Sequence, residues 1–345
     1  MPKIKAAIIG ATGFTGSELI RILSTHPKVK LNCITSESKS GEIYSHLNPQ
    51  FKGICDLKLI QMDSLDFETV DLIFLALPHR VSMSFVKAHH SKGIPIIDLS
   101  GDFRLNDAKT YEQWYEKEHE IPELVPKVTY GMPELHADQI SQSTIVANPG
   151  CFPTSSILPL APLVAEDVIE SEFIIIDSKS GVTGAGAKSK AVNHFDSANE
   201  NFKAYGLKKH RHTIEIEQQL TSLQSSDVQV QFTPHLLPLD RGILSTIYTR
   251  PKKDISDEAL YEIYHDYYQD APFIRWSVQA PSLKQVRGSN YCDLYSTYDE
   301  RTGNIISIAA IDNLVKGAAG QAVHNMNIMM GWPETDGLQH IPLQP

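Results

Sequence analysis

The chain has 345 residues, and at roughly 150 residues per domain this length predicts about two domains. Hydrophobic residues make up 41% of it and charged residues 21%, which is the balance of a globular protein rather than a disordered or membrane protein. Its 31 basic and 41 acidic residues give a net charge of −10. This charge excludes non-specific nucleic-acid binding driven by net charge and leaves room only for a local basic patch.

The cysteines and the apolar runs define the expected compartment. No two of the four cysteines form a C-x-x-C pair, which argues against a zinc site or a disulfide framework and fits a reducing cytosol. The longest strongly apolar run ends at Pro78, far short of the ~18 residues of a spanning helix, and Gly10 comes too early for a signal peptide. We expect a cytoplasmic protein without a metal, membrane or nucleic-acid partner.

The first half of the chain alternates short apolar runs with helical patterns. The apolar runs show no alternation of polar and apolar residues, as expected of strands covered on both faces. The pattern predicts a parallel, doubly wound α/β sheet of the Rossmann type. Strands are expected at Ile4–Ile9, Val29–Ile34, Asp71–Leu77 and Pro95–Leu99, and helices at Ser17–Leu23 and Val81–His90.

The pattern changes after about residue 148 and predicts a second, α+β domain. Strands are expected at Phe173–Asp177, Val228–Phe232 and Ile243–Tyr248, and a loop rich in Gly, Ser and Lys at Ser178–Lys190. Helices are expected at Thr213–Leu223, at Ile255–Gln269 with Ser256 at its start, and at Asn313–Met330. The last helix carries Ala and Gly on one side, so it can pack closely against another backbone or a ligand.

Three glycines follow the first strand at the spacing Gly10-x-x-Gly13-x-x-Gly16. Glycine lets the backbone turn tightly and approach a pyrophosphate, which the free N–H groups of the following helix can bind. The position between strand and helix favours a dinucleotide site over an ordinary glycine-rich turn.

The residues after the second strand bear on which dinucleotide binds. Glu37 could accept the ribose hydroxyls of NAD, whereas Ser36, Ser38 and Lys39 could bind the 2′-phosphate of NADP. We favour NADP, although each residue taken alone also fits a solvated polar loop. A second glycine motif, Gly181-x-x-x-x-Gly186, is followed by Ala187 and only then by Lys188. That lysine is one position late for a P-loop, which argues against an NTPase.

Cys151 lies in the segment Asn148-Pro149-Gly150-Cys151-Phe152-Pro153-Thr154. The prolines and the glycine fix the backbone there and place the thiol at the head of a helix expected from Ser155 onward. A helix N-terminus favours the thiolate, which is the nucleophilic form. We therefore expect a nucleophile at Cys151, and inert thiols at Cys33, Cys55 and Cys292.

A nucleophile of this kind needs an acid or base beside it. His210 and His212 lie among three cations ahead of an expected helix, in which Glu215 could orient an imidazole. A solvated basic turn is the alternative, but two histidines at a helix start favour a catalytic role.

Eight segments, which span nearly the whole chain, resemble the N-acetyl-γ-glutamyl-phosphate reductase family, a relative of aspartate-semialdehyde dehydrogenase. The segments are Gly10–Gly16, Leu75–His79, Asp98–Arg104, Tyr130–Leu135, Asn148–Thr154, Ser178–Gly186, His210–Ile216 and Asp312–Ala322. Two positions depart from the usual family pattern, Ser155 in place of Gly or Ala and Ile214 in place of Pro. They bear on local backbone geometry and remove no reactive group.

The resemblance implies a reaction and a set of residues. The reaction is the NADPH-dependent reduction of N-acetyl-γ-glutamyl phosphate to its semialdehyde in arginine biosynthesis, with Cys151 as acyl acceptor and His210 or His212 as proton carrier. The implied cofactor residues are Gly10, Thr12, Gly13, Phe14, Thr15, Gly16, Ser36, Ser38, Lys39, Pro78, Gly181 and Asn313. The implied substrate residues are Arg104, Asn148, Lys179, Arg211 and Glu215, with Lys188, Lys190 and Lys208 as further candidates. Arg104 and Arg211 are favoured, since a guanidinium can bind an oxyanion with two parallel bonds, whereas the lysines of the loop Ser178–Lys190 fit a solvated surface equally well.

The resemblance also implies an NADP-binding domain of residues 1–148 and 313–345, and a catalytic and oligomerisation domain of residues 149–312 in a homodimer or homotetramer. A related acyl-phosphate reductase acting on an aspartyl, aminoadipyl or carrier-linked substrate stays open. A short-chain dehydrogenase would use Tyr205-x-x-x-Lys209 or Tyr248-x-x-x-Lys252 on a helix, which Gly206 and Pro251 oppose. A dinucleotide-sensing regulator with an incidental cysteine is the non-enzymatic alternative.

Overall fold

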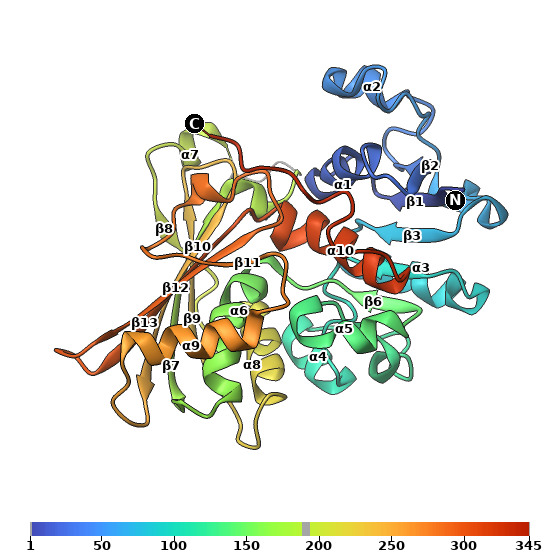
Figure 1. The fold of residues 1–345 in the computed structure, drawn as a ribbon. Coiled ribbons are helices and arrows are strands. Elements are labelled where there is room, and N and C mark those ends of the chain that lie inside the picture. The colour runs from blue at the N-terminus through green and yellow to red at the C-terminus, as the bar shows by residue number, and fades with distance from the viewer. Residues whose placement is uncertain (1, 188–193, 345) are drawn as a thin grey trace. The chain divides into compact units, whose positions relative to one another are not determined.

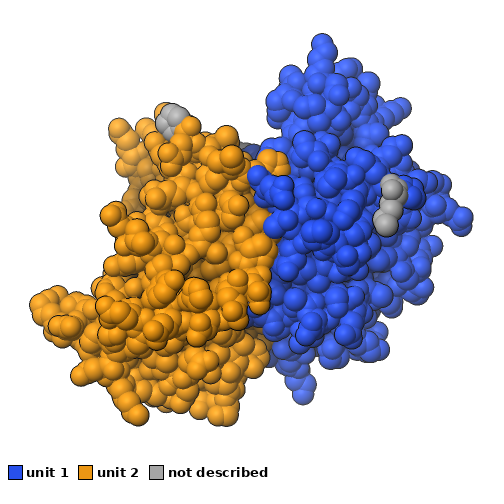
Figure 2. All heavy atoms as spheres, in the orientation of Figure 1, with its two compact units in different colours: residues 1–149, 318–339 blue, residues 150–317, 340–345 orange. Residues whose placement is uncertain are grey.

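A computed structural model describes residues 2–187 and 194–344, so Lys188 and Lys190 lie outside the described residues. The chain divides into two compact units, residues 1–149 with 318–339 and residues 150–317 with 340–345 (Figure 2). The predicted domain limits differ from these units at three places, because Pro149 groups with the first unit and residues 313–317 and 340–345 group with the second.

The first unit contains a sheet of six parallel strands in the order β2-β1-β3-β4-β6-β5 (Figure 1). Its core strands are buried throughout, from Ala6 to Ile9 and from Leu72 to Leu75, which explains why their sequences lack alternation. The predicted Rossmann-type sheet is confirmed. The strands are β1 (Ile4–Ile9), β2 (Val29–Thr35), β3 (Leu72–Leu75), β4 (Ile96–Asp98), β5 (Thr129–Tyr130) and β6 (Ile145–Ala147).

The helices of the first unit connect these strands. Helix α10 is buried from Gly320 to Ile328 and packs against α1, α5 and β4. The helix expected at Asn313–Met330 is shorter than predicted, because a π-helix occupies Val315–Ala319 before it. The helices are α1 (Phe14–Ser24), α2 (Tyr44–Leu47), α3 (Val81–His89), α4 (Ala108–Tyr115), α5 (Pro133–Ser141) and α10 (Gly320–Met329).

The second unit contains a mixed sheet of seven strands in the order β11-β12-β13-β10-β7-β9-β8. The sequence predicted only three of these strands, and it placed a loop at Ser178–Lys190 where β7 in fact continues to Gly181. The strand expected at Val228–Phe232 lies later in the chain, as β9. The strands are β7 (Ile169–Gly181), β8 (Lys203–Ala204), β9 (Gln231–Leu237), β10 (Ile243–Pro251), β11 (Ile274–Trp276), β12 (Cys292–Asp299) and β13 (Asn304–Ile311).

Buried serines lie on the covered face of β7, β10, β12 and β13, and of these four strands the sequence pattern missed β12 and β13. The hydroxyls of Ser178 and Ser245 lie 2.7 Å apart on neighbouring strands, and those of Ser296 and Ser307 lie 2.9 Å apart. All four residues are buried. Because each hydroxyl is satisfied by a hydrogen bond, serines can occupy the covered face, where a hydrophobicity pattern expects apolar residues.

Helices α6 (Cys151–Ala165), α8 (His212–Thr221) and α9 (Asp257–Tyr268) pack together on one face of this sheet (Figure 1), and the short helix α7 spans Phe195–Ala198. The predicted helices α8 and α9 are confirmed, and the Ser256 hydroxyl accepts a hydrogen bond from the amide of Ala259 at 3.2 Å. Helix α6 begins at Cys151 itself rather than at Ser155.

Two prolines inside α6, Pro159 and Pro162, leave gaps in the hydrogen-bond ladder of the helix. Pro162 has no N–H to donate to the carbonyl oxygen of Leu158. The hydroxyl of Tyr268 on α9 donates to that oxygen at 2.6 Å, and the hydroxyl of Tyr264 donates to the carbonyl of Pro159. Helix α9 therefore supplies the donor that the proline withholds.

We predict that Tyr268→Phe lowers the free energy of unfolding by about 1–3 kcal/mol, because the buried Leu158 carbonyl then loses its donor. Urea denaturation measures this change. Tyr267→Phe is the matched control, since Tyr267 is the neighbouring tyrosine on α9 but is only partly buried and has no hydrogen bond of this kind. Equal effects of the two substitutions would contradict the assignment.

Candidate active site

Cys151 is the first residue of α6; it is half-buried and forms no disulfide bond. The preceding Gly150 is extended, and its amide donates to Oε1 of Glu215 on α8 at 2.8 Å. Pro153 lies in the first turn, where the N–H that proline lacks has no helical acceptor. This local sequence therefore starts the helix at the cysteine and ties its first turn to α8.

Both predicted histidines lie at the start of α8, beside the first turn of α6. The ring of Phe152 lies 5.7 Å from the ring of His210 and 5.9 Å from that of His212, measured between centroids. The two imidazoles are 4.7 Å apart. Phe232 of β9 closes this cluster at 5.3 Å from His210. The structure thus brings Cys151, His210, His212 and Glu215 together within the second unit.

The surroundings of His210 determine its protonation state. Burial, together with the charge of Arg211, lowers the pKa of His210 to about 4. Its Nδ1 lies 3.2 Å from the backbone N–H of His212 and accepts a hydrogen bond from it. These contacts assign His210 as a neutral imidazole with its proton on Nε2. At neutral pH His210 therefore carries no second proton and no charge.

Tyr205 is a neighbour of the site that the sequence did not identify. Its ring lies 5.6 Å from that of His210. Although 37% of its surface is exposed, burial around the hydroxyl and then the charge of Cys151 raise its pKa. Tyr205 therefore keeps its proton near the cysteine. The only sequence signal was the Tyr-x-x-x-Lys spacing, which points to a different chemistry.

Gly317 lies directly against the cysteine. A Cβ atom on Gly317 would lie 2.8 Å from Cβ of Cys151, so no other residue fits without a shift. Gly317 belongs to the π-helix Val315–Ala319, a form that is frequent at functional sites. The small residues that the sequence showed in this segment thus permit a close approach of two backbone segments.

Arg104 and Asn148, both expected to bind substrate, lie in the first unit and contact one another. The Nε of Arg104 donates to the Asn148 carbonyl at 2.8 Å, and its Nη2 donates to the Leu99 carbonyl at 2.9 Å. The Asn148 side chain donates to the carbonyl of Ala318 at 3.1 Å and accepts from Asn325 at 3.0 Å. Both side chains are buried and hold backbone segments in place.

Lys179 and Arg211 are not part of the buried cluster. Lys179 forms an ion pair with Asp177 at 2.7 Å. It follows Ser178, whose hydroxyl points toward the sheet face covered by α6, so Lys179 lies on the opposite face. Arg211 precedes α8 and is exposed. The sequence could not separate the two faces of β7, because it read this segment as a loop.

Gly181 and Asn313, expected at the cofactor, contact the turn between β9 and β10. A Cβ on Gly181 would lie 2.8 Å from the amide nitrogen of Arg241, so glycine is needed there for a close approach of two chains. The Asn313 side chain accepts from the amide of Gly242 at 2.7 Å and donates to the Thr183 hydroxyl at 3.0 Å. In this structure both residues hold the protein's own backbone.

The glycine loop of the first unit has the geometry of an anion site. Gly10 has φ +94°, and a Cβ on Gly16 would lie 2.5 Å from the carbonyl oxygen of Gly10. A Cβ on Gly13 would meet no atom closer than 3.9 Å, which leaves space beside the loop. Gly13 caps α1 without a side-chain hydrogen bond, so the free amides of that helix can bind a pyrophosphate. Thr12 and Phe14 are exposed beside them, and Thr15 is half-buried.

The residues after β2 and β3 surround this loop. The Ser36 hydroxyl lies 3.1 Å from that of Thr12, and the Glu37 carboxylate accepts the amide of Met62 at 2.8 Å. Lys39 forms an exposed ion pair with Glu42 at 3.2 Å, and Ser38 and Pro78 are exposed. The predicted cofactor residues of the first unit therefore lie at the carboxyl ends of β1, β2 and β3.

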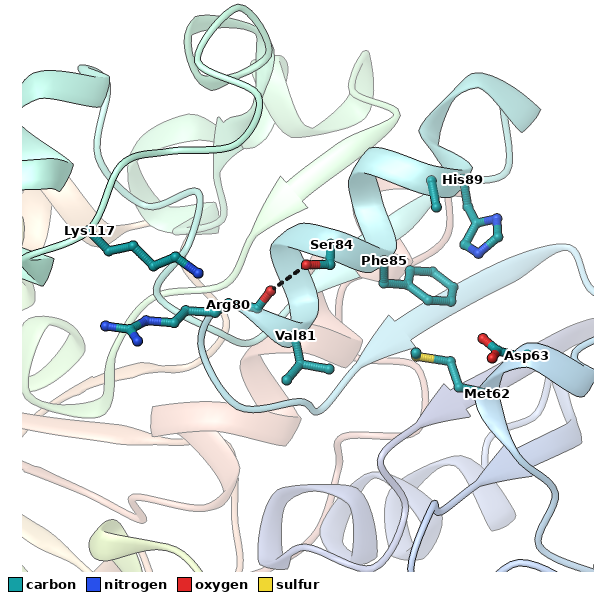
Figure 3. A pocket seen from close by; sticks show the side chains of 9 residues that line it. Met62, Asp63, Arg80, Val81, Ser84, Phe85, His89 and Lys117 are labelled. Carbon is teal, nitrogen blue, oxygen red and sulfur yellow. Dashed lines mark hydrogen bonds between the residues drawn. The ribbon is translucent and has the colours of Figure 1, made fainter.

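A pocket of about 410 Å³ lies beside helix α3 in the same unit. Figure 3 shows Arg80 and Lys117 at one end, and Met62 and Asp63 facing the helix from across the pocket. Arg80 has φ +77°, which is strained for a residue with a side chain. Asp102 holds this conformation by accepting the Arg80 amide at 2.7 Å and the Met83 amide at 3.0 Å.

The structure removes one alternative reading. Tyr205 follows the short strand β8 and Tyr248 lies in β10, so neither Tyr-x-x-x-Lys pair lies on a helix as a short-chain dehydrogenase requires. Among residues 2–187 and 194–344, no group of three metal-ligating side chains is found. Within the same residues, no helix is long and apolar enough to cross a bilayer.

Two family models match the chain. One, described as the NAD binding domain of semialdehyde dehydrogenase, matches residues 5–143, and the other, described as the dimerisation domain of semialdehyde dehydrogenase, matches residues 151–313. Fold and site thus define an oxidoreductase of the semialdehyde dehydrogenase class.

Curated relatives narrow the assignment. An N-acetyl-gamma-glutamyl-phosphate reductase of Citrifermentans bemidjiense is 49% identical over 99% of this chain and 100% of its own length. One of Desulfotalea psychrophila is 48% identical over 99% of this chain and 100% of its own. The chain belongs to the N-acetyl-gamma-glutamyl-phosphate reductase family.

Solved structures agree on the fold. The structure of aspartate semialdehyde dehydrogenase II of Vibrio cholerae, complexed with ASA, matches with a TM-score of 0.73 at 17% sequence identity. The match covers 96% of this chain and 99% of that chain. The structure of aspartate semialdehyde dehydrogenase with NADP from Candida albicans matches with a TM-score of 0.73 at 16% sequence identity, over 95% of this chain and 98% of that chain.

We predict that His210→Asn makes the stability less dependent on pH. The folded pKa of about 4 lies below the ordinary value of 6.5, so between these values the unfolded chain binds a proton that the folded chain does not. This contribution to stability is present above pH 6.5 and is lost as the pH falls toward 4. Urea denaturation at pH 7.5 and 5 should show a smaller loss in His210→Asn than in the wild type. His46→Asn, at an exposed histidine, is the control and should behave as the wild type.

Proposed function

We propose that this protein reduces N-acetyl-γ-glutamyl phosphate to N-acetylglutamate 5-semialdehyde, with release of phosphate, in arginine biosynthesis. The observation that carries the proposal is a cysteine thiol at the first position of a buried helix, with two histidines at the start of the neighbouring helix beside its first turn. The choice of substrate is supported by the 49% sequence identity to a curated N-acetyl-gamma-glutamyl-phosphate reductase.

Cys151 acts as the nucleophile. Its thiolate attacks the acyl carbon, a C–S bond forms, and the C–O bond to phosphate breaks with its electron pair leaving on the phosphate. The helix N-terminus favours the anionic sulfur. The product of this step is a thioester on Cys151.

The dinucleotide, when bound, supplies the hydride that reduces the thioester to a thiohemiacetal. We propose that His212 donates a proton to the oxygen of this group and takes it back as the C–S bond breaks, which frees the aldehyde and the thiolate. The neutral state of His210 supports this division of roles, since an imidazole with a pKa of about 4 has no proton to spare on Nδ1 at neutral pH. His210 then orients His212 through the Nδ1 contact with its amide.

The first unit carries the dinucleotide site. The open space at Gly13 and the uncapped start of α1 fit a pyrophosphate, so Gly10, Thr12, Gly13, Phe14, Thr15 and Gly16 would hold it. We propose residues 1–148 and 313–345 as the cofactor domain and residues 149–312 as the catalytic and oligomerisation domain. Arg104, Asn148, Arg211 and Glu215 stay candidates for substrate binding or for its positioning.

We propose NADP(H) as the dinucleotide. Glu37, which would bind the ribose hydroxyls of NAD, already accepts the amide of Met62. Ser36, Ser38 and Lys39 follow β2, where the 2′-phosphate of NADP would lie. Arg80 adds a guanidinium at the rim of the pocket beside α3, where Met62, Val81 and Phe85 offer apolar surface to an adenine ring (Figure 3).

We propose that the chain is cytoplasmic and forms a homodimer or a homotetramer. The match to a dimerisation domain supports self-association. The sheet face opposite α6 supports it as well, because Ile175, Leu244, Ile306 and Ile308 are only half-buried there and Tyr248 is exposed. None of the four cysteines forms a disulfide bond in the described structure, which fits a reducing compartment.

A phosphate-dependent oxidation assay tests the substrate. N-acetylglutamate semialdehyde with NADP should give turnover, whereas aspartate semialdehyde or NAD should give at least ten-fold less. Cys151→Ser should abolish turnover and Cys33→Ser should retain it, because Cys33 lies in strand β2. Activity with aspartate semialdehyde alone would reject the substrate, and an active Cys151→Ser enzyme would reject the mechanism.

The choice of dinucleotide has its own prediction. Arg80→Gln should weaken NADPH binding by about ten-fold or more, because a charge-assisted hydrogen bond to phosphate is lost, and should leave NADH binding unchanged. Fluorescence titration measures both affinities. Lys30→Gln, at an exposed cation in β2, is the control. Unchanged NADPH affinity in Arg80→Gln would exclude this residue as a phosphate ligand.

A further inference from the structure

A charged pair lies at the end of β13, outside the proposed catalytic residues. Asp312 is fully buried, and its carboxylate binds the guanidinium of Arg241 through Nε at 3.0 Å and Nη2 at 3.0 Å. Arg241 lies in the turn between β9 and β10, and its side chain is 19% exposed. Burying such a pair costs solvation free energy, so it is weak evidence for stability by itself.

The same carboxylate organises the turn that follows it. It accepts the amides of Leu314 at 2.9 Å and Val315 at 3.2 Å, and also that of Gly288 at 2.7 Å. The carbonyl oxygen of Asp312 accepts the amide of Gly317 at 3.0 Å. The backbone from residue 312 to residue 317 is therefore wound around one aspartate.

Neighbouring residues fix this turn from two further sides. The side chain of Asn313 binds the amide of Gly242, next to Arg241, and the hydroxyl of Thr183. Lys316 is fully buried, with its ammonium group 5.7 Å from the centroid of the Phe273 ring. The turn is thus held by contacts with three other segments of the second unit.

The far end of the turn is the backbone that touches the nucleophile. Gly317 lies against Cys151 so closely that a methyl group would lie 2.8 Å from Cβ of the cysteine. A shift of the turn by a few tenths of an ångström would either press on the cysteine or open a gap beside it. The place of the sulfur at the start of α6 thus depends on where the turn is held.

We propose that Arg241 and Asp312 are positioning residues for Cys151, and that they act through the π-helical turn and Gly317. This inference rests on the proposed role of Cys151 as the nucleophile. The paired geometry of the guanidinium is essential to it, because lysine keeps the charge but cannot bind both carboxylate oxygens in the same way.

Alkylation of Cys151 by iodoacetamide tests the proposal without substrate or cofactor. Peptide mass spectrometry follows Cys151 apart from the buried Cys55 and Cys292 and the half-buried Cys33. Arg241→Lys and Asp312→Asn should each slow the alkylation at pH 7 by about ten-fold, which is ~1.4 kcal/mol, and should shift the pH at which its rate is half-maximal. Gly317→Ala should do the same.

The chain offers a matched control in Arg287→Lys. Arg287 forms an exposed ion pair with Asp240 at 2.8 Å, next to Arg241, so the same substitution falls on a neighbouring pair that does not contact the turn. Its alkylation rate should stay within two-fold of the wild type. Amide hydrogen exchange of residues 312–319 should become faster in Arg241→Lys and not in Arg287→Lys.

The outcomes separate the proposal from the assigned function. Alkylation at the wild-type rate and pH profile in a folded Arg241→Lys protein would overturn the positioning role. If Asp312→Asn fails to fold, Arg241→Lys and the exchange measurement decide. A Cys151→Ser enzyme that keeps its turnover would instead reject the thioester mechanism, while the alkylation data would still report whether the turn positions this thiol.

Discussion

The hydrogen bond between the amide of Gly150 and the buried carboxylate of Glu215 joins helix α6 to helix α8. Helix α6 begins with Cys151 and α8 begins with His212, so this contact ties the first turn of one helix to the first turn of the other. A carboxylate at a helix N-terminus is favoured by the free amides there. Glu215 therefore has a structural reason to be buried, in addition to any contact with substrate.

The rest of the second unit supports that junction. Helix α6 lies on a sheet whose covered face carries serines, and the hydroxyl of Ser155 joins it to Ser245 at 2.7 Å. Ser155, one of the two departures from the family pattern, thus forms a hydrogen bond that Gly or Ala cannot form. On the other side, α9 supplies tyrosine hydroxyls to the carbonyls near the two interior prolines of α6. Polar contacts on both sides hold the helix that carries the nucleophile.

In the first unit, too, close backbone contacts and side-chain hydrogen bonds fix the loops. Gly10 and Gly16 lie where two backbone segments nearly touch, and the space beside Gly13 is left open. Hydrogen bonds join the loop after β4 to the turn after β3. Asp102 accepts the amides at the start of α3, and the amide of Gly101 donates to Nδ1 of His79 at 2.8 Å. Asp102 and Arg104, both in a segment that stood out in the sequence, therefore hold backbone groups of the first unit in place.

The sequence by itself determined the parallel sheet of the first unit, the glycine loop at its first turn and the cysteine at a helix start, because these depend on local chemistry and on continuous apolar runs. It did not predict β12 and β13 of the seven-stranded sheet, where the hydrogen-bonded hydroxyls of Ser296 and Ser307 stand on the covered face in place of apolar side chains. It could not show that His210 is neutral either, because this follows from burial beside Phe152 and Phe232, which are distant from His210 in the chain. Only the tertiary structure placed Gly317 against Cys151 and wound the intervening turn around Asp312. Such contacts depend on which distant segments of the chain meet in the fold, and a local sequence pattern does not predict this.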